Sequence, residues 1–248
     1  MSAPDWLTAR PIAHRGLHKR HEGILENTRS AFLAAVEGGF AIECDVQLSR
    51  DGEAVVFHDF TLERLTQIAG RVNEMTAADL KSVPFKETTD RIETLAEMLA
   101  LVDGRVPVIV EIKSAFDGDL KLTRRAASVI SGAKGQIALK SFDSNVVAAL
   151  RMVAPELPRG IIAQKNYDYA EWSRLTPQLS EQLATLAHLP ETAPDFISYN
   201  VNDLEQNIDM IREVAAGLPI MTWTVRTPEQ RALANAYANQ MVFEGFIP

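Results

Sequence analysis

Short apolar runs alternate with amphipathic segments along nearly the whole chain. Eight runs have the length and composition of β-strands: RPIAHRG (10–16), AIECDV (41–46), VPVIVEIK (106–113), QIALKSF (136–142), RGIIAQ (159–164), DFISYN (195–200), LPIMTWTV (218–225) and MVFEGFI (241–247). Apolar residues with helical spacing predict helices within residues 26–39, 94–104, 145–156, 204–217 and 227–240. Because strands dense in Val and Ile suit a parallel sheet buried on both faces, the pattern predicts an α/β fold, a TIM (β/α)8 barrel.

A ninth run, AVVFHD (54–59), follows the second strand too closely for a helix to lie between them. The dipeptide Asp51-Gly52 is a strong hairpin signal, since a type I′ turn needs positive φ at both central residues. With these two residues as the turn, Asp45 faces His58, and alternation puts Glu43 on the same side of the sheet. The expected fold is therefore a barrel with a β-hairpin extension after strand 2, and the position of His58 depends on this register.

The composition fits one large core. The chain has 248 residues, 46% of them hydrophobic, and contains neither a linker-like segment nor a short repeat, so we expect a single domain over residues 1–248. A net charge of −8 argues against sequence-independent binding to nucleic acid or to an anionic membrane. The sequence shows neither a signal-like start nor an apolar stretch of about 20 residues, so we expect no stable membrane anchor. Cys44 is the only cysteine, which excludes an internal disulfide, and we expect a cytoplasmic protein.

Polar residues lie at the ends of several predicted strands, where barrels carry their active sites. They are His14 and Arg15 at the end of the first strand, Glu43 and Asp45 of the second, Glu111 and Lys113 of the third, and Trp223 near the end of the seventh. Three neighbouring carboxylates repel one another by about 4 kcal/mol per pair at 4 Å, even at an effective dielectric constant near 20. A divalent cation removes this repulsion, and a set of oxygen ligands favours Mg²⁺ or Ca²⁺.

Carboxylates and a cation alone would serve either enolate or phosphoryl chemistry. Two histidines change this balance, because imidazoles exchange protons near neutral pH and His14 and His58 can divide the acid and base roles. Arg15 and Lys113 offer positive charge to phosphate oxygens. An enolase-like lyase with Lys113 as its base would leave both histidines and Arg15 unexplained.

The motifs together resemble a known family. HRG, ENT, ECD, VVFHD and EIK are similar to the motifs of the glycerophosphodiester phosphodiesterase family, and IETLAEML, KSFD and TWTV extend the resemblance over nearly the whole chain, from Pro11 to Ile247. Each motif alone has little specificity, whereas the combination is highly specific. The resemblance implies a metal-dependent barrel that hydrolyses glycerophosphodiesters, small-molecule substrates, to an alcohol and glycerol 3-phosphate.

The resemblance also implies roles for individual residues. It makes His14 and His58 the acid and base, Glu43, Asp45 and Glu111 the metal ligands, Arg15 and Lys113 the phosphate ligands, and Trp223 a wall that packs on glycerol. Asn27 either lies beside the site or caps the following helix. Glu26 either helps to hold the ion or favours the amino terminus of that helix.

Some alternatives remain open at this stage. The basic residues of the first loop, residues 18–21, either contact a substrate headgroup or form a solvated surface, and exposed variable loops favour the second interpretation. A lysophospholipase D-like enzyme and a non-catalytic phosphoester-binding barrel are the competing functions. The released alcohol, the choice between Mg²⁺ and Ca²⁺, the acid and base assignment of the two histidines, and the oligomeric state are not determined by the sequence.

Overall fold

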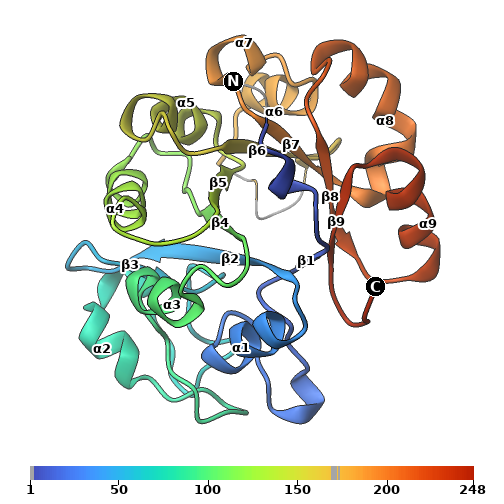
Figure 1. Cartoon of the computed structure of the whole chain (residues 1–248). Helices are drawn as coiled ribbons and strands as arrows, with labels where there is room; N and C mark the ends of the chain where they lie inside the picture. Colours follow the sequence, from blue (N-terminus) through green and yellow to red (C-terminus); the bar gives the residue numbers. More distant parts are fainter. Residues whose placement is uncertain (1–2, 169–171, 173) are drawn as a thin grey trace. The chain divides into compact units, whose positions relative to one another are not determined.

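The computed structural model describes residues 3–168, 172 and 174–248 (Figure 1). The strands are β1 (Ile12–Ala13), β2 (Ala41–Leu48), β3 (Ala54–Val56), β4 (Val108–Ile112), β5 (Ile137–Ser141), β6 (Arg159–Ala163), β7 (Phe196–Asn200), β8 (Ile220–Val225) and β9 (Gln240–Phe243). The helices are α1 (Arg29–Glu37), α2 (Ala77–Ser82), α3 (Leu95–Val102), α4 (Lys121–Ile130), α5 (Ser144–Val153), α6 (Pro177–Ala184), α7 (Leu189–Thr192), α8 (Val201–Val214) and α9 (Pro228–Tyr237). The fold is a (β/α)8 TIM barrel with β3 as a hairpin arm, as predicted.

All nine predicted strands and all five predicted helices are present. Helices α2, α4, α6 and α7 add to them. Among the described residues, no helix is long and apolar enough to cross a membrane.

The described chain divides into two compact units, each discontinuous in sequence. The first unit contains Ile12–Lys113 and Leu120–Ile137, and the second contains the residues before Ile12, Ser114–Asp119 and Ala138–Pro248. They are called the N-terminal and C-terminal units below. The single domain expected over residues 1–248 stays a prediction.

Strand β2 organises the N-terminal unit because it pairs in parallel with both β1 and β4. The register places Asp45 beside Glu111 and Cys44 beside Val110. Neighbouring residues of a parallel pair point to the same face, so the acidic side chains share one face and the apolar ones share the other. Cys44 lies on the apolar face and is fully buried.

The β2–β3 hairpin has a different register from the predicted one. Gln47 pairs with Val55, and Phe57 rather than His58 donates its backbone N–H to the Asp45 carbonyl, at 3.0 Å. The loop between Ser49 and Glu53 contains three residues and ends on Gly52, which has a φ of +83°. A three-residue loop that ends on a left-handed glycine shifts the pairing by one residue relative to a two-residue type I′ turn. The predicted opposition of Asp45 and His58 is therefore wrong, and His58 lies beyond the last residue of β3.

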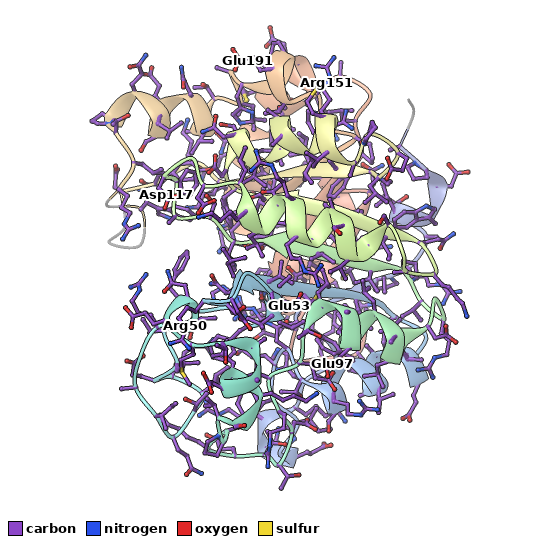
Figure 2. All side chains as sticks on the ribbon, turned by 90° about the vertical axis from the view of Figure 1, so that its left-hand side faces the viewer. Arg50, Glu53, Glu97, Asp117, Arg151 and Glu191 are labelled. Atoms are coloured by element: carbon purple, nitrogen blue, oxygen red, sulfur yellow. The ribbon has the colours of Figure 1, made fainter. Side chains whose placement is uncertain are left out.

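Charged side chains cover the outside of this hairpin. Figure 2 labels Arg50 and Glu53 on this hairpin, and Arg50 is exposed. Arg125 of α4 donates from Nε and Nη2 to the carboxylate of Glu53, at 2.9 and 2.7 Å. This ion pair connects the hairpin to α4 within the N-terminal unit.

The segment between β3 and α3 contributes most of a small apolar core, together with Leu25 and with Val55 of β3. The members from the segment are Phe57, Leu62, Leu65, Val72, Leu80, Val83, Phe85 and Ile92. Thr76 and Thr94 begin α2 and α3 with capping boxes, in which the threonine hydroxyl accepts from a backbone N–H three residues later. Figure 1 shows the segment around α2 beside β3. This core fixes the chain that immediately follows His58.

The C-terminal unit continues the alternation of strands and helices. Strands β5 to β9 pair in parallel in chain order, and the buried apolar residues between strands and helices include Ile161, Ile197 and Leu204. Gly160 on β6 lies against the ring of Phe196 on β7, where an added Cβ would be only 2.2 Å from a ring carbon. Only glycine permits this close packing of the two strands.

Candidate active site

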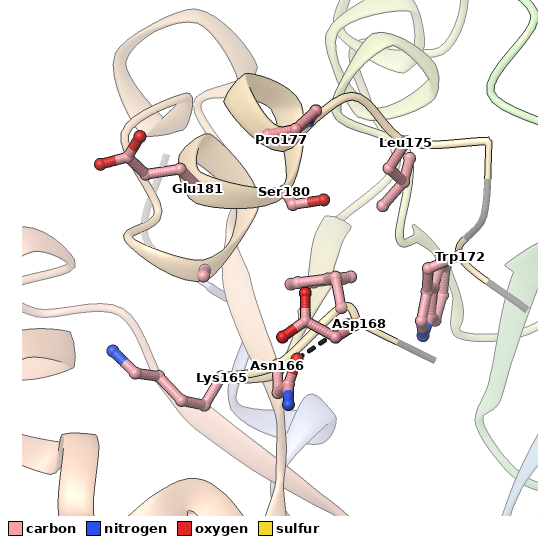
Figure 3. Close-up of a pocket in the computed structure, with 10 residues that line it drawn as sticks. Lys165, Asn166, Asp168, Trp172, Leu175, Pro177, Ser180 and Glu181 are labelled. Atoms are coloured by element: carbon pink, nitrogen blue, oxygen red, sulfur yellow. Dashed lines mark hydrogen bonds between the residues drawn. The ribbon is translucent and has the colours of Figure 1, made fainter. Parts of the chain in front are cut away.

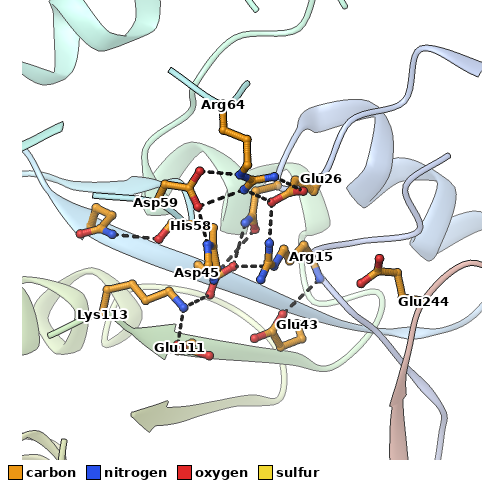
Figure 4. Close-up of polar contacts among 12 residues, drawn as sticks. Arg15, Glu26, Glu43, Asp45, His58, Asp59, Arg64, Glu111, Lys113 and Glu244 are labelled. Carbon is orange, nitrogen blue, oxygen red and sulfur yellow. Dashed lines mark hydrogen bonds and ion pairs between the residues drawn. The ribbon is translucent and has the colours of Figure 1, made fainter. Parts of the chain in front are cut away.

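Three buried carboxylates meet on one face of the strands of the N-terminal unit (Figure 4). Glu43 and Asp45 come from β2 and Glu111 comes from β4, and one oxygen of each lies within 4.8 Å of the others. The geometry follows from the strands, because Glu43 and Asp45 are two residues apart and Asp45 is beside Glu111. The three predicted metal ligands are thus brought together.

The donor set fits a hard divalent cation. All three side chains offer carboxylate oxygens, and carboxylates are the ligands that Mg²⁺ and Ca²⁺ prefer. As whole residues, each of the three is at most 6% exposed, so solvent does little to screen their mutual repulsion.

Lys113 supplies positive charge to the same cluster. Its Nζ lies 2.8 Å from Oδ1 of Asp45 and 2.5 Å from Oε1 of Glu111. Burial opposes the charge on Lys113, but the two carboxylates outweigh burial and raise its pKa above the ordinary value. Burial likewise opposes the charge on Asp45, yet Lys113, His58 and Arg15 hold the pKa of Asp45 well below its usual range. The repulsion that predicted a cation is therefore partly offset by protein cations.

The HRG motif forms a tight turn directly after β1. Arg15 and Gly16 both have positive φ, and their N–H groups donate to the carboxylate and the carbonyl of Glu43, at 3.1 and 3.2 Å. A Cβ at position 16 would lie 2.9 Å from Ala31, so the turn requires glycine. The turn places Nε of Arg15 at 3.3 Å from Oδ2 of Asp45. His14, which precedes the turn, is buried.

Asn27 contacts the site rather than capping a helix. Helix α1 begins after Thr28, while Asn27 has a φ of +55°, which asparagine tolerates better than most residues. Its amide group donates to Oδ2 of Asp45 at 2.9 Å and accepts from the Asp45 N–H at 3.2 Å. The helix-cap interpretation is wrong, and Asn27 instead orients one of the three carboxylates.

His58 begins a chain of charged contacts that returns to the carboxylate cluster. Its Nδ1 lies 2.6 Å from Asp59, whose carboxylate also accepts from Arg64 at 2.6 Å. Arg64 donates to Glu26 as well, and Glu26 accepts from Arg15 at 2.6 Å (Figure 4). His58 is thus connected to Arg15 through three charged side chains.

These contacts perturb both carboxylates in the chain. Burial raises the pKa of Asp59, but hydrogen bonds from His58 and Arg64 outweigh burial and hold it below the usual range. Burial is also outweighed at Glu26, where Arg64 and Arg15 lower the pKa to about 2. Both groups are therefore ionised throughout the neutral range.

Sequence reasoning gave no role to Asp59 or Arg64. Asp59 belongs to the quoted VVFHD motif, whereas nothing in the spacing of Arg64 distinguishes it from a surface residue. Glu26 pairs with two arginines and lies outside the first turn of α1. Among the described residues, the carboxylates that could hold an ion together are Glu43, Asp45 and Glu111, and Glu26 is not one of them.

Among the basic residues of the first loop, Lys19, Arg20 and His21 are exposed and His18 is partly buried, and Lys19 and Arg20 pair with acidic residues. Arg20 donates to Glu87 from Nε at 2.8 Å, and Nζ of Lys19 lies 3.3 Å from Glu22. These contacts favour the interpretation of a solvated surface.

Trp223 belongs to an aromatic cluster in the C-terminal unit. Its indole N–H donates to the Ser198 carbonyl at 2.9 Å. Its ring packs edge-on against Phe142, with 5.4 Å between the ring centroids. The rings of Phe142 and Trp172 also pack together, with 4.8 Å between their centroids, and Trp172 contacts Tyr167. The predicted contact between Trp223 and glycerol stays a prediction.

A cavity of about 500 Å³ follows β6 in the same unit (Figure 3). Its lining combines the charges of Lys165, Asp168 and Glu181 with the ring of Trp172. None of the site residues predicted from the sequence lines this cavity.

The fold and the carboxylate cluster together define a barrel enzyme with a candidate metal centre. The model of the glycerophosphoryl diester phosphodiesterase family matches residues 14–247. The chain belongs to this family and is a phosphoric diester hydrolase.

Two relatives illustrate the sequence similarity. The glycerophosphodiester phosphodiesterase of Caldanaerobacter subterraneus subsp. tengcongensis is 34% identical over 163 residues, which is 62% of this chain and 66% of the relative. A probable glycerophosphodiester phosphodiesterase 1 of Mycobacterium tuberculosis is 27% identical over 250 residues, covering 90% of this chain and 85% of the relative.

Solved structures share the fold. A phosphodiesterase of Oleispira antarctica, in complex with the product sn-glycerol-3-phosphate, has a TM-score of 0.77 at 21% identity and covers 98% of this chain and 95% of its own. A glycerophosphodiester phosphodiesterase of Thermotoga maritima has a TM-score of 0.68 at 25% identity, with coverages of 94% and 92%.

Proposed function

We propose that this protein hydrolyses glycerophosphodiesters to an alcohol and glycerol 3-phosphate, with a divalent cation held by Glu43, Asp45 and Glu111. The observation that carries the proposal is the convergence of these three buried carboxylates in a chain of this family. The product bound to the Oleispira antarctica relative supports glycerol 3-phosphate as the product here. When bound, the cation supplies positive charge that offsets charge on the phosphate oxygens.

The protein's own cations bind the phosphate group in this proposal. Arg15 and Lys113 both contact Asp45 and carry permanent positive charge, so they meet phosphate oxygens without a change of protonation. Asn27 keeps the Asp45 carboxylate in place, and Trp223 packs on the glycerol moiety through its indole face.

His14 and His58 divide the general acid and general base roles. The Asp59 carboxylate accepts hydrogen bonds and donates none, so it selects the tautomer of His58 with hydrogen on Nδ1. Nε2 of His58 is then the atom that exchanges a proton with the substrate. The attacking group is either the neighbouring glycerol hydroxyl, which gives a cyclic phosphate that water then opens, or water itself. Detection of a transient cyclic phosphate during turnover would support attack by the glycerol hydroxyl, and its absence would support direct attack by water.

The test is hydrolysis of a panel of glycerophosphodiesters before and after metal removal. We expect glycerol 3-phosphate from at least one diester, loss of turnover with a chelator, and recovery with Mg²⁺ or Ca²⁺. Full turnover after exhaustive metal removal contradicts the role of the cation. Absence of hydrolysis for the whole panel contradicts the activity and favours a phosphoester-binding protein. The cytoplasmic location stays a prediction from the sequence.

A further inference from the structure

Arg64 makes two forked contacts with two different carboxylates of the N-terminal unit (Figure 4). Its Nε and Nη2 lie 2.6 and 3.1 Å from the two oxygens of Asp59. Its Nη1 and Nη2 lie 2.9 and 2.7 Å from the two oxygens of Glu26. The guanidinium therefore satisfies both carboxylates at once, in the planar geometry that only arginine offers.

Each of these carboxylates continues to a residue of the proposed catalytic machinery. Asp59 accepts from Nδ1 of His58 at 2.6 Å, and Glu26 accepts from Nη1 of Arg15 at 2.6 Å. The side chain of Arg64 is itself 42% exposed, whereas those of Glu26 and Asp59 are 14% and 22% exposed. The four contacts therefore hold one exposed guanidinium against two partly buried carboxylates, each of which contacts a residue of the proposed site.

We propose that Arg64 is a positioning residue that fixes His58 through Asp59 and Arg15 through Glu26. The inference rests on the proposed function, because that function gives His58 and Arg15 their tasks. Arg64 itself makes no contact with substrate in this account. It acts by restricting the rotation of two side chains whose orientation decides proton transfer and phosphate binding.

Arg64→Lys tests the fork without removing the charge, because an ammonium cannot hold both carboxylates in one plane. Arg125→Lys is the matched control: Arg125 is 39% exposed and forms a forked pair in the same unit with Glu53, a hairpin residue outside the proposed site. We expect Arg64→Lys to lower kcat on glycerophosphocholine by about 10- to 100-fold, as losses of orienting partners do. Arg125→Lys should stay within about twofold of the wild type, with a similar melting temperature.

The orientation of His58 has a readout that does not depend on turnover. In ¹⁵N-labelled protein without added metal, the imidazole signals of neutral His58 should report hydrogen on Nδ1 in the wild type and in Arg125→Lys. In Arg64→Lys this preference should weaken towards a mixture of tautomers. If Arg64→Lys fails to fold, Asp59→Asn and Glu26→Gln each break one fork, and Asp59→Asn should change the His58 signals while Glu26→Gln leaves them closer to wild type.

The outcomes separate this inference from the proposed function. Unchanged His58 signals together with kcat within about twofold of wild type in Arg64→Lys overturn the inference, as does an equal loss of kcat in Arg125→Lys. An inactive wild type overturns the proposed function, whereas the His58 signals still decide whether Arg64 holds the imidazole.

Discussion

Two sets of buried polar side chains, one from each unit of the chain, differ in their charged partners. In the N-terminal unit, Glu43, Asp45 and Glu111 are buried as charges, beside Lys113 and Arg15. In the C-terminal unit, His188 and Tyr199 are buried without charged hydrogen-bond partners. Burial is costly for a charge unless partners or an ion compensate, and much less so for a neutral group. The first environment therefore indicates chemistry, and the second indicates packing.

His58 and His188 illustrate the difference in charged partners between the two sets. His58 is 30% exposed on its side chain and contacts the ionised Asp59. His188 is 7% exposed, and burial lowers its pKa to about 4. A histidine that keeps an ionised partner suits proton transfer, whereas a histidine held neutral suits a core. The predictions below test this contrast.

The largest effect is expected from the carboxylate cluster. Asp45→Asn and Glu111→Gln each remove one charged oxygen ligand, so cation affinity should fall by at least about 100-fold and turnover at low cation concentration should fall with it. Titration of activity with Mg²⁺ and Ca²⁺ measures this. Glu53→Gln on the hairpin is the control and should leave the titration unchanged. If both site variants have a much lower melting temperature but bind the cation as tightly as the wild type, the cluster has a structural role instead.

Loss of either catalytic histidine is expected to come next. His14→Ala and His58→Ala should each lower kcat on glycerophosphocholine by about 10² to 10⁴, with a smaller effect on KM. A nitrophenyl phosphodiester has a leaving group that needs no protonation, so the variant that it rescues has lost the general acid. Near wild-type rates of both variants on both substrates contradict the two-histidine mechanism.

His188 should affect stability and leave turnover unchanged. Its folded-state pKa of about 4 lies below the unfolded value near 6.5, so the unfolded chain takes up a proton first as the pH falls. The free energy of unfolding should therefore decrease by about 2 kcal/mol from this group between pH 7 and pH 5, and stop decreasing below its folded pKa.

The contribution of His188 is measured as a difference between proteins. Urea unfolding of the wild type and of His188→Gln at both pH values separates this group from the carboxylates, which titrate in both. An equal pH dependence in the two proteins shows that His188 is not held neutral.

The smallest effect is expected at Trp223. Trp223→Ala removes an apolar wall and the N–H bond to Ser198, and a lost substrate contact of this type should raise KM about tenfold, or about 1.4 kcal/mol. Trp223→Phe keeps the apolar surface and should recover most of the loss. A fall in kcat with unchanged KM in Trp223→Ala contradicts the proposed glycerol contact.

The sequence determined the features that depend on local periodicity. Alternation along β2 and β4 was enough to put Glu43 and Asp45 on one face and Glu111 on a matching face, because side-chain direction in a strand repeats every two residues. The order of strands and helices was predicted for the same reason, since each element carries its own apolar pattern.

The contacts made outside regular strands and helices follow from packing in three dimensions. The three-residue loop that ends on Gly52 shifted the hairpin by one residue, and His58 obtains its position from the packed segment that follows β3 rather than from strand pairing. The sequence left Asn27 open between a site position and a helix cap, and Asn27 contacts Asp45 because its φ is positive and its backbone N–H donates to the Arg15 carbonyl. Such contacts join residues that are far apart in sequence, and no periodic pattern along the chain encodes them.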